Sequence, residues 1–172
     1  MLEDAFRFRG RAFLFGDNID TDAIINVNYL NVADPALLAP HCLEELSPGL
    51  SARARKGDIL VAGDNFGCGS SREQAPLAIM GCGFSCVIAK SFSRLFYRNA
   101  INLGLPAITA DAAAFAAEGE EIAVDCLSGV IRIPRADKEI SGAPLPPFML
   151  EILRLGGLAG FLKEQLKAEG RL

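Results

Sequence analysis

The stretch GDNFGCGSSREQAP, residues 63–76, joins a predicted strand to a predicted helix. The apolar run before it, residues 58–62 (DILVA), has the length of a buried strand, and the sequence over 72–81 is typical of a helix. Three glycines in the connecting loop indicate unusual backbone dihedrals or a ligand close to the backbone. Free amides and the start of a helix both favour negative charge, so this unit predicts an anion-binding site.

Strand and helix signals alternate along the rest of the chain. Short apolar runs predict strands at 11–15, 58–62, 84–88, 105–109, 121–125 and 130–133. Apolar spacing predicts helices at 35–46, 72–81, 91–103 and 146–168, the last with a break at Gly156-Gly157. The order predicts an α/β fold, a mostly parallel sheet with flanking helices and a late antiparallel hairpin whose tip is Leu127-Ser128-Gly129. Residues 142–147 (GAPLPP) then form a turn or linker.

Composition narrows the class of protein. The 172 residues, 51% hydrophobic and 22% charged, suit one globular domain over 1–172. The formal net charge of -4 argues against a nucleic-acid partner. No apolar stretch reaches the ~18 residues of a membrane span, and the N-terminus lacks a signal-peptide pattern. We therefore expect a cytoplasmic protein with no membrane contact.

Neither the cysteines nor the acidic loop predicts a metal site. Five cysteines without a CxxC spacing indicate reduced, mostly buried thiols. Asp17, Asp20 and Asp22 lie close together in residues 16–30, but the glycine and closing glutamate of a calcium loop are missing. These carboxylates either shape the loop through Asx-turns or act on a partner or substrate. We expect this chain to bind no metal.

The residues after the glycine loop carry the candidate chemistry. Arg72 offers a planar guanidinium that suits a carboxylate. Ser70 with Glu73, or Ser71 with Gln74, has the spacing of a capping box, which accounts for one of the two serines. Pro76 predicts a late or distorted start of the helix that follows the serines.

Other catalytic motifs do not fit. Nucleotide-binding glycine motifs and GxSxG are absent, and His41, the single histidine, is interpreted as an ordinary surface or packing residue.

Three stretches together carry a family resemblance: GDNIDTD at 16–22, GDNFGCGSSRE at 63–73 and FSRLFYRNAINLGLP at 92–106. Over about residues 10–160 the chain resembles the small subunits of the isopropylmalate dehydratase and homoaconitase group, which correspond to the swivelling C-terminal domain of aconitase. The resemblance implies a swivelling β/β/α-type domain. It also implies half of a hydro-lyase whose large subunit carries a [4Fe-4S] cluster, with no cofactor on this chain.

The resemblance also implies roles for individual residues. Ser70 would be the general base that removes and returns the proton alpha to a carboxylate, and Asp22 would orient an acid or base of the large subunit. Arg72 would clamp the substrate carboxylate, with Ser71 as a cap or carboxylate donor and Gly69 beside it. Arg98 and Asn99 match the family's RNA segment, where helix packing and loop bracing explain them as well as substrate contact does.

Substrate choice in the group is implied to involve Tyr29, Leu30, Asn31 and Val32. No arginine or lysine lies between Arg11 and Arg53, which counts against a third carboxylate. Isopropylmalate is therefore the leading substrate for a hydroxy-acid isomerase in leucine biosynthesis. Homoaconitate, citraconate or methylmalate, and dimethylmalate stay open, as does a non-catalytic anion-binding module, although such a module has no use for a serine base.

Overall fold

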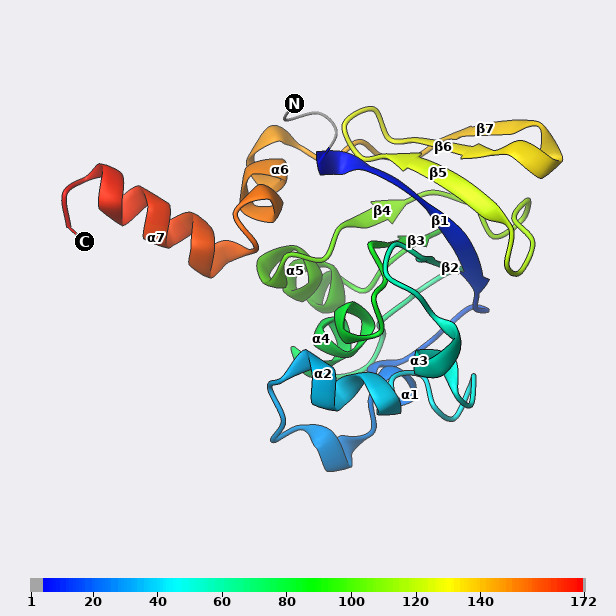
Figure 1. Ribbon diagram of the computed structural model, residues 1–172, viewed down its shortest axis with the longest axis horizontal. Helices are drawn as coiled ribbons and strands as arrows, with labels where there is room; N and C mark the ends of the chain where they lie inside the picture. Colours follow the sequence, from blue (N-terminus) through cyan, green and yellow to red (C-terminus); the bar gives the residue numbers. More distant parts are fainter. Residues whose placement is uncertain (1–4, 172) are drawn as a thin grey trace.

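Seven strands form one mixed sheet in the order β4-β3-β2-β1-β5-β6-β7 (Figure 1). The computed structural model describes residues 5–171. The strands are β1 (Arg7–Leu14), β2 (Ile59–Ala62), β3 (Cys86–Ala89), β4 (Ala107–Thr109), β5 (Glu121–Asp125), β6 (Val130–Ile133) and β7 (Lys138–Ser141).

Strands β1 to β4 run parallel and make up one half of the sheet. Every residue of β2 and β3 is buried, because both faces of these central strands are covered. That is why their sequences, ILVA and CVIA, are continuous apolar runs. The predicted parallel sheet is confirmed here.

The other half is antiparallel and larger than the predicted hairpin. β1 pairs antiparallel with β5 on its second edge, and β6 and β7 extend the sheet. Burial alternates in β5 and β6, as expected for strands with one covered face. The sequence did not predict β7, because KEIS is mostly exposed and carries no apolar run.

Helices connect the parallel strands and close the chain. The α-helices are α1 (Thr21–Ile24), α2 (Pro35–Leu38), α3 (Leu50–Arg53), α4 (Gln74–Gly81), α5 (Arg94–Leu103), α6 (Pro147–Arg154) and α7 (Leu158–Ala168). The 3-10 helices are η2 (Val27–Tyr29), η3 (Ala39–His41) and η4 (Pro134–Ala136). Figure 1 shows α1, α2 and α3 gathered on the side of α4 that faces away from the antiparallel strands.

Two cores lie on the two faces of the parallel strands. Leu60 of β2 and Val87 of β3 pack with α2, α4 and α5 in the first core. Their sequence neighbours, Val61 and Ile88, point to the opposite face and pack with the antiparallel strands and α6. The layers are therefore antiparallel strands, parallel strands and helices, which confirms the β/β/α-type fold.

The predicted helix over 35–46 is wrong beyond residue 41. Two short helical pieces, α2 and η3, occupy its first part. Leu43 then adopts a left-handed φ of 51°, and its amide donates to the Ile24 carbonyl at 2.8 Å instead of to a helical acceptor. This contact with the end of α1 thus outweighs the helical pattern of the local sequence.

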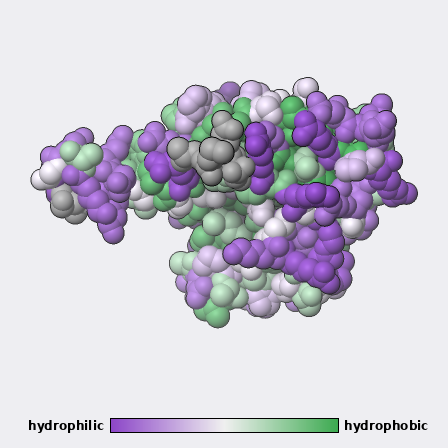
Figure 2. Space-filling view, turned by 45° about the horizontal axis from the view of Figure 1, so that its top comes forward, coloured by the Kyte–Doolittle hydropathy of each residue, from purple (hydrophilic) through white to green (hydrophobic). Residues whose placement is uncertain are grey.

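The C-terminal helices follow the prediction. α6 ends before Gly156 and Gly157, whose φ angles of 74° and 107° no ordinary helix contains. α7 then extends away from the rest of the molecule, and most of its surface is hydrophilic (Figures 1 and 2). None of the helices within residues 5–171 has the length and apolar character needed to cross a membrane.

Candidate functional site

The loops that follow β1 and β2 lie side by side at the carboxyl edge of the parallel strands. Backbone hydrogen bonds of 2.7–2.8 Å join them, from Asn18 to Asp64, from Gly67 to Ile19 and from Thr21 to Cys68. The two acidic and glycine-rich stretches that the sequence singled out therefore form one surface. Parallel strands place such loops together because their carboxyl ends meet at one edge.

Close packing within the chain explains two of the three glycines. A Cβ on Gly67 would overlap the Phe96 ring, and the φ of 74° is left-handed. A Cβ on Gly63 would overlap the Asp17 carboxylate, which accepts a hydrogen bond from the Asp64 amide at 2.7 Å. Gly69 has more room, so its φ of 88° is what requires glycine there.

The prediction that Ser70 or Ser71 caps the following helix is wrong. α4 begins at Gln74 with Glu73 at the N-cap position and no side-chain capping bond, so both serines lie ahead of the cap. The late start is confirmed. Pro76 is the third helical residue, where no intrahelical donor is needed. Both hydroxyls are thus released from a structural role in this helix.

Ser70 is exposed, and only its backbone is fixed. Its carbonyl accepts a hydrogen bond of 2.9 Å from the hydroxyl of Thr21, a residue that is 2% exposed. Its own hydroxyl makes no hydrogen bond to any residue between 5 and 171. The hydroxyl of Ser71, in contrast, accepts from the Asn99 amide at 3.2 Å. Asn99 therefore braces the loop, as one of the two sequence interpretations expected.

Arg72 forms an ion pair with Asp22 across the two loops. The Arg72 side chain is 10% exposed and that of Asp22 is 57% exposed. Nη1 of Arg72 also donates to the Ile25 carbonyl at 3.2 Å. The Nε and Nη2 groups have no hydrogen-bond partner in the described part of the chain, so donors remain for a ligand carboxylate.

The segment Tyr29, Leu30, Asn31 and Val32 borders the start of α4. The Leu30 carbonyl accepts from Nε2 of Gln74 at 2.7 Å. Leu30 is 37% exposed, Asn31 is exposed and Val32 packs against the first core. The structure therefore places this segment against the helix that follows the serine loop.

His41 has a packing role. Its ring stacks on Tyr29 with 3.9 Å between centroids, and Nδ1 lies 3.0 Å from the Glu44 carboxylate. This contact supports the prediction that His41 is an ordinary surface or packing residue.

Sequence reasoning missed a second charged pair at the same edge. Lys90 and Ser91 follow β3, and both contact the Asp64 carboxylate, Lys90 at 3.0 Å and Ser91 at 3.1 Å. The hydrogen bond from Lys90, with that from Ser91, lowers the pKa of Asp64. The sequence could have indicated this pair, because Lys90 and Ser91 directly follow a predicted parallel strand and residues in that position lie at the same edge of the sheet as the serine loop.

A pocket beside Asp22 does not suit an anion. It has a volume of 130 Å³, and its lining includes the carboxylates of Asp22, Glu44 and Glu45. Three carboxylates repel a dicarboxylate. An anionic ligand is therefore expected on the Ser70 side of Arg72.

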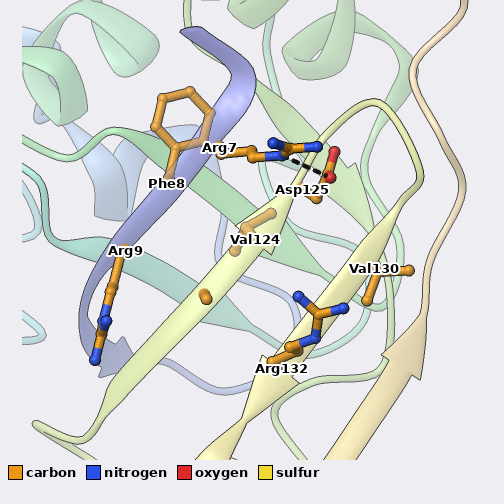
Figure 3. Close-up of a pocket in the computed structure, with 8 residues that line it drawn as sticks. Arg7, Phe8, Arg9, Val124, Asp125, Val130 and Arg132 are labelled. Atoms are coloured by element: carbon orange, nitrogen blue, oxygen red, sulfur yellow. Dashed lines mark hydrogen bonds and ion pairs between the residues drawn. The ribbon is translucent and has the colours of Figure 1, made fainter. Parts of the chain in front are cut away.

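A pocket of 170 Å³ on the antiparallel strands is lined by three arginines (Figure 3). In Figure 3 the side chain of Arg7 points to Asp125, 3.1 Å away. Burial by itself would raise the pKa of Asp125, but the hydrogen bonds from Arg7 and from two backbone amides outweigh it and lower the pKa. Arg9 and Arg132 pair with glutamates of the same strands. Each of these arginines has a carboxylate partner, as Arg72 does, but the lining of this pocket contains no serine, so it offers no hydroxyl beside the guanidinium groups.

The four buried thiols lie in two pairs, because Cys42 interacts with Cys82 and Cys86 interacts with Cys126. All five cysteines are free, and four of them are buried. Across residues 5–171 we find no group of three or more His, Cys, Asp or Glu side chains placed to hold a metal ion.

The site can now be compared with known proteins. The model of the aconitase C-terminal domain matches residues 44–113, which run from before β2 to just past β4. The 3-isopropylmalate dehydratase small subunit of Caldicellulosiruptor saccharolyticus is 54% identical over 94% of both chains.

Two further matches bear on substrate and fold. The 2,3-dimethylmalate dehydratase small subunit of Eubacterium barkeri is 48% identical over 90% of this chain and 95% of its own. A crystal structure of 3-isopropylmalate dehydratase from Methanocaldococcus jannaschii superposes with a TM-score of 0.90 at 44% identity, over 96% of this chain and 98% of that one.

Proposed function

The chain belongs to the family of 3-isopropylmalate dehydratase small subunits, and we propose that it pairs with a large subunit to interconvert 2-isopropylmalate and 3-isopropylmalate in leucine biosynthesis. The reaction removes water from one isomer and adds it back in the other orientation. One observation carries the proposal: the exposed Ser70 hydroxyl has no partner among residues 5–171 and lies two residues from a guanidinium with spare donors.

Each residue of the loop has a defined task in this reaction. Ser70 removes the proton alpha to a substrate carboxylate and returns it on rehydration. A serine hydroxyl is a weak base, so Ser70 must act as an alkoxide, which becomes the hydroxyl when it accepts the alpha proton and is the alkoxide again when it returns that proton. Nearby amides and positive charge stabilise the alkoxide. The free Nε and Nη2 of Arg72 hold the carboxylate, while Asp22 orients the guanidinium and the partner's acid or base.

The metal chemistry belongs to the partner. We place a [4Fe-4S] cluster on the large subunit, where an open iron supplies Lewis acidity for loss of the substrate hydroxyl. This chain covers the other side of the substrate and excludes water from it. The small subunit alone is therefore expected to be inactive. Five free thiols fit a reducing compartment, and we place the enzyme in the cytoplasm.

The segment next to the serine loop favours a substrate with two carboxylates. Leu30 is partly exposed and apolar, Asn31 is uncharged, and no arginine or lysine lies between Arg11 and Arg53. A third carboxylate would lack a charged partner there. The match to a 2,3-dimethylmalate dehydratase small subunit at 48% identity makes dimethylmalate the second candidate, because it is also a branched, apolar malate.

The test is an anaerobic assay of the chain co-purified with the large subunit from the same organism. 2-Isopropylmalate, 2,3-dimethylmalate, citraconate and homoaconitate are offered in parallel, and the formation or loss of the unsaturated acid is followed by its ultraviolet absorbance. We expect the highest kcat/KM with 2-isopropylmalate. The small subunit alone and the large subunit alone are the controls.

A higher kcat/KM with dimethylmalate would make dimethylmalate the substrate in place of isopropylmalate, and the proposed hydro-lyase reaction would stay the same. Inactivity with all four substrates, in a complex whose cluster is intact by absorbance and spin resonance, would contradict the enzyme proposal and favour an anion-binding module.

A further inference from the structure

One face of α5 is exposed beside the serine loop. The opposite face packs into the two cores through Phe96, Ala100 and Ile101. Four exposed residues share the outer face at helical spacing, and we call them the α5 stripe: Arg94, Leu95, Arg98 and Asn102. Leu95 is 48% exposed and lies between Arg94 and Arg98 on this face.

The two arginines of the α5 stripe have no acidic partner. Neither Arg94 nor Arg98 makes a hydrogen bond or ion pair with another residue in the described range 5–171, and α5 contains no Asp or Glu. Arg94 lies in the first turn, where the helix dipole disfavours positive charge. The stability of α5 therefore does not explain these charges, and a partner with carboxylates does.

The α5 stripe is continuous with the serine loop. Asn99, at the edge of the same face, donates to the Ser71 hydroxyl at 3.2 Å. Leu95 lies one turn before Asn99, at i,i+4 spacing, and Arg98 directly precedes Asn99 in the helix. A macromolecule that closes over Ser70 from outside must therefore also cover part of the stripe.

The chemistry of the stripe indicates what covers it. Protein interfaces combine an apolar centre with a polar rim, and arginine is enriched in them. The α5 stripe has this composition, with an exposed leucine between two unpaired arginines. A small dicarboxylate would not need Leu95 or Asn102. A second copy of this chain would face the same unpaired arginines, whereas a complete hydro-lyase already requires a second subunit over the serine loop.

We propose that the α5 stripe docks against the large subunit and that Arg98 contacts a carboxylate of that subunit. The proposal rests on the proposed function, since it takes the large subunit as the partner. It goes further by assigning a specific surface of this chain to the interface.

The experiment measures association, separately from catalysis. The dissociation constant between this chain and the large subunit of the same organism is determined without substrate at two salt concentrations. Arg98→Glu and Leu95→Asp are compared with Arg135→Glu, which makes the same charge change at an exposed site in the turn between β6 and β7. Thermal unfolding of each free variant checks that the fold is intact.

We expect Arg98→Glu and Leu95→Asp to raise the dissociation constant about tenfold or more, with no change for Arg135→Glu. The affinity of the wild type should fall as salt rises, and the fall should be smaller for Arg98→Glu. An unchanged dissociation constant with a raised KM in the Arg98→Glu complex would overturn the proposal and assign Arg98 to substrate.

Failure of the two proposals can be told apart. If the wild type binds and Arg98→Glu binds equally well, the stripe is not the interface, although the enzyme proposal stands. If the wild type does not bind the large subunit at all, the proposed function is contradicted in its choice of partner, and the docking proposal is contradicted as well. Self-association of the free chain that Arg98→Glu abolishes would instead assign the stripe to a second copy.

Discussion

Two arginine–aspartate pairs lie at opposite edges of the parallel strands, and they differ in which partner is buried. At the amino edge, Asp58 is 5% exposed and Arg11 is 34% exposed. At the carboxyl edge, Arg72 is 10% exposed and Asp22 is 57% exposed. One pair buries its acid and the other buries its base.

The buried acid is saturated with donors. Asp58 accepts hydrogen bonds from the backbone amides of Arg11 and Arg55 and from Nε and Nη2 of Arg11, at 2.6–3.2 Å. Burial by itself would raise the pKa of Asp58, but these hydrogen bonds outweigh it and hold the pKa below its ordinary value. The Asp58 carboxylate therefore has no free acceptor position for a ligand. It joins β1 to the turn before β2.

The buried arginine is not saturated. Arg72 has one hydrogen bond to a carbonyl and an exposed carboxylate beside it, and two of its nitrogens have no partner within residues 5–171. The comparison teaches that a filled pair maintains the fold, whereas an incomplete pair beside an exposed hydroxyl has the donors that our proposal assigns to a substrate carboxylate. Substitutions at the two edges should therefore affect different properties.

The largest effect is expected at the carboxyl edge, from Ser70→Ala in the assembled complex. Loss of a general base costs about 10²–10⁴ in kcat, and the substrate dissociation constant should change little. Because the hydroxyl has no partner in the described chain, thermal unfolding should stay as in the wild type. Steady-state assays and equilibrium binding check this, with Ser128→Ala at the β5–β6 turn as the control. Near-normal turnover would remove Ser70 from the role of base.

At the amino edge, Asp58→Asn should reduce stability and leave the chemistry intact. The new amide would direct N–H groups toward the Arg11 donors, and the loss of this buried charge partner should cost about 2–3 kcal/mol. Denaturant unfolding measures this change, and kcat is measured on the folded complex. A large fall in kcat with unchanged stability would break the distinction between the two edges.

The same pair gives a pH dependence. The folded pKa of Asp58 lies below its unfolded value, so its stabilisation is complete above about pH 5 and is lost as the pH falls through the folded pKa. Asp58→Asn should therefore lose less stability than the wild type between neutral and acid pH. Denaturant unfolding of both proteins over this range tests the sign. Parallel curves for the two proteins would show that Asp58 does not contribute.

Arg72→Lys should have a smaller effect than either change above. Lysine keeps the charge and can still reach Asp22, but it has no planar fork for a carboxylate. We expect KM to rise about tenfold, which corresponds to about 1.4 kcal/mol, with stability close to that of the wild type. Arg132→Lys, on the antiparallel strands, is the matched control. Equal KM values for the wild type and Arg72→Lys would show that the spare donors do not hold substrate.

The sequence predicted local features better than pairings between distant segments. β2, the glycine loop and α4 could be predicted because an apolar run, glycines and helical spacing follow one another within 30 residues. The ion pair of Arg72 with Asp22 joins loops 50 residues apart, and only the fold places them together. The left-handed Leu43 depends on a long-range hydrogen bond in the same way. The glycine loop and the guanidinium made Ser70 and Arg72 candidates, and the resemblance supplied the role of base that spacing alone did not.

The smallest effect is expected where neither partner of a pair is buried. Arg132 and Glu139 lie 2.9 Å apart on β6 and β7, and their side chains are 68% and 57% exposed. Water and salt screen such a pair, so Glu139→Gln should change the free energy of unfolding by less than about 0.5 kcal/mol and leave kcat unchanged. Denaturant unfolding at low and high salt measures this. A loss as large as that of Asp58→Asn would mean that the presence of a pair matters more than the burial of its acid, and the contrast between the two edges would fail.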